Sequence, residues 1–214
     1  MPAPTPPPRY APVIPLPPYS YVPGHDHPHP VTDPRGHLFN APKPAPLPLD
    51  QLPSDPTSRR QAIAALFAPH PDWLHALDLF NEGYAWEAHE AWEQFWHALG
   101  RTTPEARFVQ GLIHLAAAAV KIREGKPAGV TKHTQRAREL LGVEEAASVG
   151  ESGGAGVDTL GMDPSSLIAV LAELQRYRPE CWHTSRCSVV KIRPATPRRD
   201  GWRRSGPSAR GRRA

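Results

Sequence analysis

The clearest helix signal in this chain lies at residues 80–99, which read FNEGYAWEAHEAWEQFWHAL. At about 100° per residue, the large apolar side chains gather on one wide face. That face consists of Tyr84, Ala88, Ala91, Trp92, Phe95 and Leu99, with Trp96 at its margin. His89 and Glu93 are four residues apart and share one flank, whereas Glu87 lies on the opposite flank. The pattern predicts an amphipathic helix that is buried through its aromatic side chains and follows a tight corner at residues 81–83.

Further helical patterns surround this one, beginning near residues 57, 72, 104, 127 and 166. The pattern at 104–124 is apolar nearly all round, so we expect it to be the central helix. It carries one narrow polar stripe, formed by Arg107, Gln110, His114 and Lys121. Glu105 and Arg123 lie roughly opposite the stripe and are expected to face solvent, which turns Gln110 and His114 inward. The fold class predicted is all-α, a compact antiparallel bundle of five or six helices.

Proline divides the chain into three parts. Seventeen of the 28 Pro residues fall within residues 1–50, where they prevent long helices or strands. We expect a Pro-rich arm and linker at 1–56, a helical bundle domain at 57–178 and a disordered basic tail at 179–214. The arm is either a solvated polyproline II segment or, because it carries many large apolar side chains, an extended strap along the bundle.

Charge and cysteine content limit the possible partners and the cellular compartment of the protein. Residues 191–214 hold nine Lys or Arg against one Asp, a charge of +8, which leaves 16 Lys or Arg against 20 acidic residues, or −4, elsewhere. A tail of this kind is suited to electrostatic association with nucleic acid, and the alternative is a solvated tail. Cys181 and Cys187 make no disulfide framework and favour a reducing cytosol. The longest apolar run, at 115–120, is too short to span a bilayer, so we expect a cytoplasmic protein without membrane contact.

Two motifs carry a resemblance to a known family. FNEGYAWEAHEAWEQFW and QGLIHLAAA, followed by REGKPAG and a short helix after LGMDP, are similar to domain-of-unknown-function family 309 over about residues 72–176. The resemblance implies a small helical bundle of prokaryotic type, with no established cofactor or catalytic residue. The family pattern maps onto Asn81, Gly83, Glu87, His89, Glu90, Glu93, Trp96, Gln110 and Gly111. His114 stands where the family commonly has Gln, which puts in doubt any mechanism that needs an amide there.

The candidate site joins the flank of the 80–99 helix to the polar stripe of the central helix. Its candidate ligand-binding residues are His89, Glu93, Gln110, His114, Trp96, Tyr84 and Glu87. One hypothesis is a structural hydrogen-bonded network of the buried polar groups. A second is a mononuclear metal site formed by His89, Glu93 and His114. A third is a small-ligand pocket in which Glu93 anchors the ligand between aromatic walls.

Two familiar metal motifs are excluded by the residues themselves. A zincin helix needs a second His where this chain has Glu93, and a di-iron bundle needs Glu-x-x-His pairs that are missing here. The leading functional hypothesis is therefore a binding or scaffold module with a buried His/Glu/Gln site, whose ligand or protein partner and cofactor stay open. The alternatives are a metal-dependent hydrolase that uses His89 and Glu93, and a nucleic-acid-associated protein that acts through residues 191–214.

Overall fold

The computed structural model describes residues 9–42, 45–142, 160–176 and 191–194 of the 214-residue chain. Those residues form six α-helices and no β-strand, which confirms the all-α prediction. A short 3-10 helix, η1, precedes them. The elements in order are η1 (Leu49–Gln51), α1 (Pro56–Phe67), α2 (Pro71–Asn81), α3 (Ala85–Ala98), α4 (Pro104–Arg123), α5 (Pro127–Leu141) and α7 (Pro164–Gln175).

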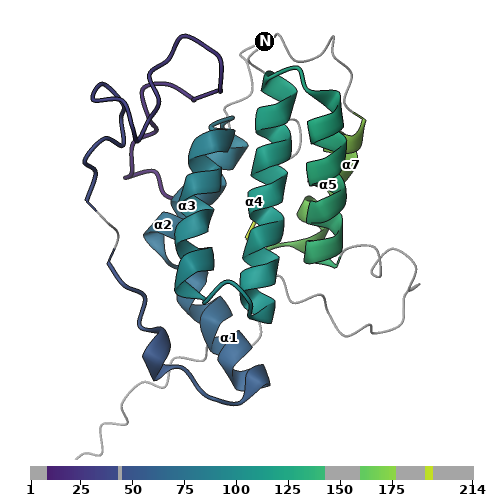
Figure 1. The fold of residues 1–214 in the computed structure, drawn as a ribbon. Helices are drawn as coiled ribbons and strands as arrows, with labels where there is room; N and C mark the ends of the chain where they lie inside the picture. Colours follow the sequence, from purple (N-terminus) through teal and green to yellow (C-terminus); the bar gives the residue numbers. More distant parts are fainter. Residues whose placement is uncertain (1–8, 43–44, 143–159, 177–190, 195–214) are drawn as a thin grey trace, which may run out of the picture.

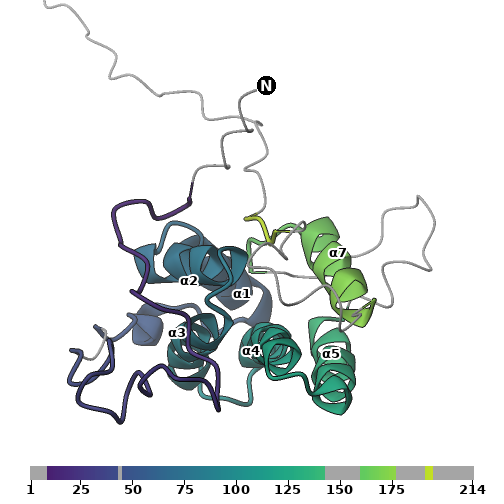
Figure 2. The ribbon, with the colours of Figure 1, turned by 90° about the horizontal axis from the view of Figure 1, so that it is seen from above.

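The helices pack in two layers. Figure 2 shows α3, α4 and α5 side by side in one layer, with α2, α1 and α7 in the other. Helix α4 lies between α3 and α5 (Figure 1), and its most extensive helix contacts are with these two neighbours. The core between the layers includes Trp73, Trp92, Phe67, Leu112 and Leu115, all at most 2 % exposed. The central position predicted for the 104–124 segment is therefore correct.

Helix starts follow from local sequence chemistry. Asp55, Thr103 and Asp163 each accept a backbone N–H from the first turn of α1, α4 and α7, and a Pro follows each of them directly. An N-cap acceptor and a Pro whose missing N–H is not needed together favour a helix beginning at that point. Gly83 forms the corner before α3 with φ +87°, a conformation that glycine adopts without strain.

Helices α4 and α5 approach each other closely at Gly111. A Cβ built on Gly111 would lie 2.7 Å from Leu141 Cγ and 2.8 Å from Leu141 Cδ2. Because these are core side-chain atoms with little freedom to move, only glycine permits this helix spacing. The close approach fixes how far the polar side chains of α4 stand from those of α5.

The N-terminal arm runs along α2 and α3 as a strap, so the second of its two predicted forms is correct for residues 9–42 (Figures 1 and 2). Asp78, which is 2 % exposed, accepts the backbone N–H of Tyr10 and that of Ala11, both at 2.8 Å. Glu87 accepts the N–H of Tyr21, also at 2.8 Å. Two buried carboxylates of the bundle therefore satisfy backbone donors of the arm.

Residues 191–194 also pack on the bundle, although the sequence predicted disorder from 179 onward. The Asn81 side chain donates to the Ile192 carbonyl at 2.8 Å and accepts the Ile192 N–H at 2.9 Å. The Ile192 side chain is fully buried, and Lys191 Nζ lies 2.6 Å from Glu82 Oε1. Burial of Ile192 and the paired amide contacts explain why this segment docks. The remainder of the predicted tail lies outside the described residues.

The rotation of α4 differs from the expectation. Glu105 is not on the solvent side: it is 6 % exposed and its Oε1 lies 3.3 Å from Arg60 Nε. Arg107 is exposed, and Gln110 and His114 are half-buried. The reason is that α3 and α5 cover the flanks of α4 while the second layer covers its back, so the polar stripe occupies the front. The site expected to be buried therefore lies at the surface of the three-helix layer.

Candidate functional site

The first polar group on this layer belongs to α3 alone. His89, Glu90 and Glu93 each present one potential metal-ligand atom, and these atoms all lie within 4.8 Å of one another. His89 Nδ1 is shielded from solvent, forms no hydrogen bond with the described residues, and lies 3.6 Å from Glu90 Oε1, too far for a good bond. The side chains of His89 and Glu90 are 27 % and 33 % exposed, so the group is reachable from solvent.

The second polar group joins α4 to α5. His114 Nδ1 lies 2.9 Å from His133 Nδ1, with the ring centroids 5.2 Å apart. Burial lowers the pKa of His114 to about 4, helped by the positive charges of His133, Arg136, His89 and Lys132. Burial likewise lowers the pKa of His133, with contributions from Lys121, Lys132 and His89. The pair is therefore neutral at pH 7 and lies in a positive local field.

The structure divides the predicted site residues among separate surroundings. Among the described residues, no hydrogen bond joins His89, Glu93, Gln110 and His114 to one another, so the predicted network has no bond to support it there. His114 uses its Nδ1 for His133, and Glu90 takes its place beside His89 and Glu93. The mononuclear trio drawn from the sequence is thus replaced by three side chains of one helix.

The aromatic residues predicted to wall a pocket mainly serve packing. Trp92 is fully buried in the core. Trp96 and Tyr84 are half-buried and pack against the core cluster, and the Arg101 guanidinium lies 5.3 Å from the centre of the Trp96 ring. The indole N–H groups of Trp92 and Trp96 are buried without a hydrogen-bond partner among the described residues.

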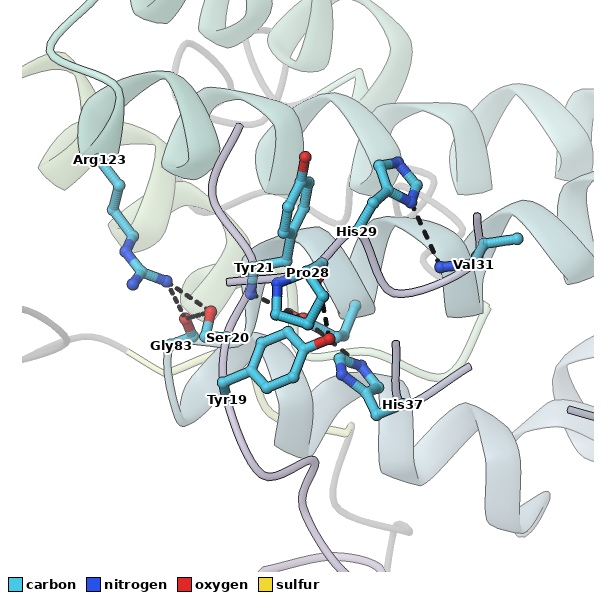
Figure 3. Close-up of polar contacts among 10 residues, drawn as sticks. Tyr19, Ser20, Tyr21, Pro28, His29, Val31, His37, Gly83 and Arg123 are labelled. Carbon is cyan, nitrogen blue, oxygen red and sulfur yellow. Dashed lines mark hydrogen bonds and ion pairs between the residues drawn. The ribbon is translucent and has the colours of Figure 1, made fainter. Parts of the chain in front are cut away.

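Glu87 lies under the arm, on the side of α3 away from His89. Figure 3 shows the arm residues of this region, including Tyr19, Ser20, Tyr21 and His37. Its Oε1 lies 3.7 Å from His37 Nε2, and the two side chains are only 2 % and 8 % exposed. Burial raises the pKa of Glu87, opposed by the Tyr21 N–H and the charge of Arg123, and burial lowers the pKa of His37. Both groups are thus biased toward their neutral forms.

Arg123, at the end of α4, reaches the same arm segment. It donates to Ser20 Oγ and to the Gly83 carbonyl, and Ser20 Oγ also donates to that carbonyl (Figure 3). Tyr21 and His29 each contact the Trp86 ring in a T-shaped arrangement, with centroids 5.2 and 5.3 Å away. Glu87 therefore belongs to the arm-docking surface and is not part of the His89 group.

The site residues predicted from the sequence include neither His133 nor His37. His133 stands on a helix that reads as basic and amphipathic, and its periodicity places it near the α4 side, but a helical wheel does not say which α4 residue it meets. His37 follows Pro and Gly in a segment with no period. Glu90 was named only in the family pattern and not among the candidate site residues, although its position next to His89 in sequence is the signal that could have included it.

The fold and these two groups define the class: an all-α protein with a His/Glu face on one layer and a docked N-terminal strap on the other side of α3. The model of the family described as Domain of unknown function (DUF309) matches residues 73–133. This match extends from α2 into α5 and confirms the family resemblance over that range. No curated protein and no solved structure matches the chain. In the part of the chain that is described, no helix has the length and apolar character needed to cross a membrane.

Proposed function

We propose that this protein is a metal-binding helical module in which α3 supplies His89, Glu90 and Glu93 to a divalent transition-metal ion. The observation that carries the proposal is the convergence of the three ligand atoms within 4.8 Å of one another. An imidazole with two carboxylates is a donor set suited to Zn²⁺, Co²⁺ or Mn²⁺. Bonds of about 2.0–2.2 Å to a shared ion need donors roughly 3 Å apart, a distance that small changes of these half-exposed side chains can reach.

The surroundings of His89, Glu90 and Glu93 also support metal binding. His89 Nδ1 has no hydrogen bond among the described residues, and the carboxylate near it, at 3.6 Å, is that of Glu90 in the same group, so a cation bound there would break no hydrogen bond of this nitrogen. The charge of two carboxylates offsets that of a divalent ion, which lowers the cost of holding it. Three protein ligands also leave coordination positions for water or a ligand group, as binding sites with exchangeable ligands require.

The test is a Co²⁺ titration of the chelator-treated full chain, followed by visible absorption. We expect one Co²⁺ to bind per chain, and His89→Gln and Glu93→Gln each to weaken binding at least tenfold, about 1.4 kcal/mol. His97→Gln is the matched control, because His97 is exposed on the same helix and bonded to Arg101 instead.

Circular dichroism of each variant checks that the helices are retained. The proposal fails if Co²⁺ does not bind the folded wild-type chain. It also fails if the His97 variant loses binding as much as the His89 and Glu93 variants do, because the ion would then not be held by the α3 group.

A further inference from the structure

A separate open pocket of about 740 Å³ lies beside the His114–His133 pair. Most of its lining residues are of polar or charged types, and they come from α5 together with one residue of α4. The lining residues are His114, Ala128, Thr131, Lys132, His133, Gln135, Arg136 and Glu139. A pocket of this volume falls within the range that holds small-molecule ligands. None of these residues belongs to the His89, Glu90 and Glu93 group.

The charge of the pocket favours an anion. Lys132 and Arg136 are exposed, and the one carboxylate in the lining, that of Glu139, is paired with Arg136 at 2.9 Å. Burial is the main reason that a proton on His114 is disfavoured, and the permanent positive charges of Arg136 and Lys132 add to it. The local potential is therefore positive, and a negative group placed there would be stabilised.

The neutral histidine pair adds directional hydrogen bonding. Two Nδ1 atoms 2.9 Å apart require that one of them carries the hydrogen and the other accepts it. The ring that donates through Nδ1 then has a bare Nε2, and the ring that accepts has an Nε2–H. A neutral pair thus offers one N–H donor, and a protonated pair would offer two. Gln135 also lies in the lining, and its amide nitrogen, which donates to Glu139 Oε1 at 3.4 Å, has a second N–H.

We propose that this α4–α5 pocket binds the phosphate group of a small molecule between Lys132, Arg136 and the His114–His133 pair. A phosphate presents several acceptor oxygens and up to two negative charges, which matches a guanidinium, an ammonium and imidazole donors better than a carboxylate does. The pocket is larger than one phosphate, so space remains for the rest of the molecule.

Binding of the anion is coupled to protonation of the pair. A phosphate beside His114 offsets the positive field that now disfavours its proton, so protons are taken up on binding. The charged and titratable groups around the pair come from three helices. They are His89, Glu90 and Glu93 on α3, Lys121 and Glu124 on α4, and Lys132, Arg136 and Glu139 on α5.

The experiment is calorimetric titration of the metal-free full chain with inorganic pyrophosphate at constant ionic strength. We expect saturable binding, weakened at least tenfold by Lys132→Ala and by Arg136→Ala. Arg107→Ala is the control, because it removes one exposed positive charge from α4 outside the pocket. Repeating the titration near pH 6 in buffers of different ionisation enthalpy measures the proton uptake.

Three results would overturn the proposal. Pyrophosphate could give no more heat than chloride at equal ionic strength. The Lys132 and Arg136 variants could bind as the wild type does, which would place the anion elsewhere, for example on the Arg-rich segment after residue 194. A phosphodiester oligonucleotide could bind more tightly than pyrophosphate and lose affinity with the same two variants, which would make the occupant a nucleic acid. Because no metal is present, failure here is distinct from failure of the α3 metal site.

Discussion

Replacing Asp78 with Asn is predicted to release the beginning of the N-terminal arm from the bundle. The Asp78 carboxylate is buried, and each of its oxygens accepts one backbone N–H, from Tyr10 and from Ala11, at 2.8 Å. Asparagine is nearly the same size but has only one acceptor oxygen. Its NH₂ group must therefore face one of the two arm N–H donors.

The magnitude follows from these two contacts. A hydrogen bond to a charged acceptor contributes about 1.5–3 kcal/mol, and a buried donor left unpaired costs about 1–3 kcal/mol. One bond survives in weaker, neutral form and the other is lost, so we expect about 2–4 kcal/mol less stability for the docked arm. Since about 1.4 kcal/mol corresponds to a factor of ten, the open form of the arm becomes roughly 30- to 700-fold more populated.

Amide hydrogen exchange measured by mass spectrometry checks this prediction. Peptides that cover residues 9–16 should exchange faster by that factor, whereas peptides of α4 should keep their protection because the arm opens locally. Asp50→Asn is the control, since Asp50 is exposed and its side chain forms no hydrogen bond or ion pair with the described residues. Unchanged exchange in the arm of a folded Asp78 variant would refute the idea that this carboxylate holds it.

Three further changes test other parts of the structure. Gly111→Ala should lower the free energy of unfolding by about 1–3 kcal/mol in urea, because its Cβ would meet Leu141 in the core. Gly129→Ala should cost less, because the three atoms nearest to its Cβ belong to the half-buried Lys121 side chain, at 2.9–3.3 Å, and equal costs would contradict the packing argument. The folded-state pKa of His114, about 4, lies below its ordinary value near 6.5, so the unfolded chain binds the proton better. The free energy of unfolding therefore falls as pH drops from about 6.5 to 4, by on the order of 2–3 kcal/mol. His114→Gln should remove this dependence on pH, and a variant whose free energy of unfolding in urea still falls by the same amount would refute the assignment. Asn81→Ala should expose residues 191–194 to protease by deleting both amide contacts with Ile192, and continued protection would show that burial of Ile192 suffices.

The helices themselves could be predicted from the sequence because their signals are local. Asp55, Thr103 and Asp163 stand directly before Pro residues, and an N-cap acceptor followed by Pro marks a helix start whatever the rest of the chain does. The aromatic face at 80–99 is also a property of one helix and its period. Both features held in the structure, with α3 at Ala85–Ala98 buried through Trp92 and Phe95.

The site could be predicted only in part. Helical periodicity gives the direction of a side chain around its own helix axis, but it does not say which residue of a neighbouring helix that side chain meets. His89 and Glu93 share a flank by spacing alone, and they do lie together. The periodicity of the central helix correctly placed Gln110 and His114 on the same side of it. Whether that side faces the interior of the bundle or solvent depended on which sides of the helix α3 and α5 cover. The predicted inward orientation was wrong, since Glu105 proved to be the buried carboxylate.

By itself, then, the sequence determined an all-α bundle of five or six helices, most of their starts, the apolar face of α3 and one pair of site residues, because each is set by neighbours within a few positions. The tertiary structure alone decided that His114 meets His133, that Glu87 holds the arm, and that Asn81 binds Ile192. Those contacts join residues 19, 66 and 111 positions apart. They depend on helix rotation, on the close approach at Gly111, and on the need of buried carboxylates and amides for hydrogen-bond partners.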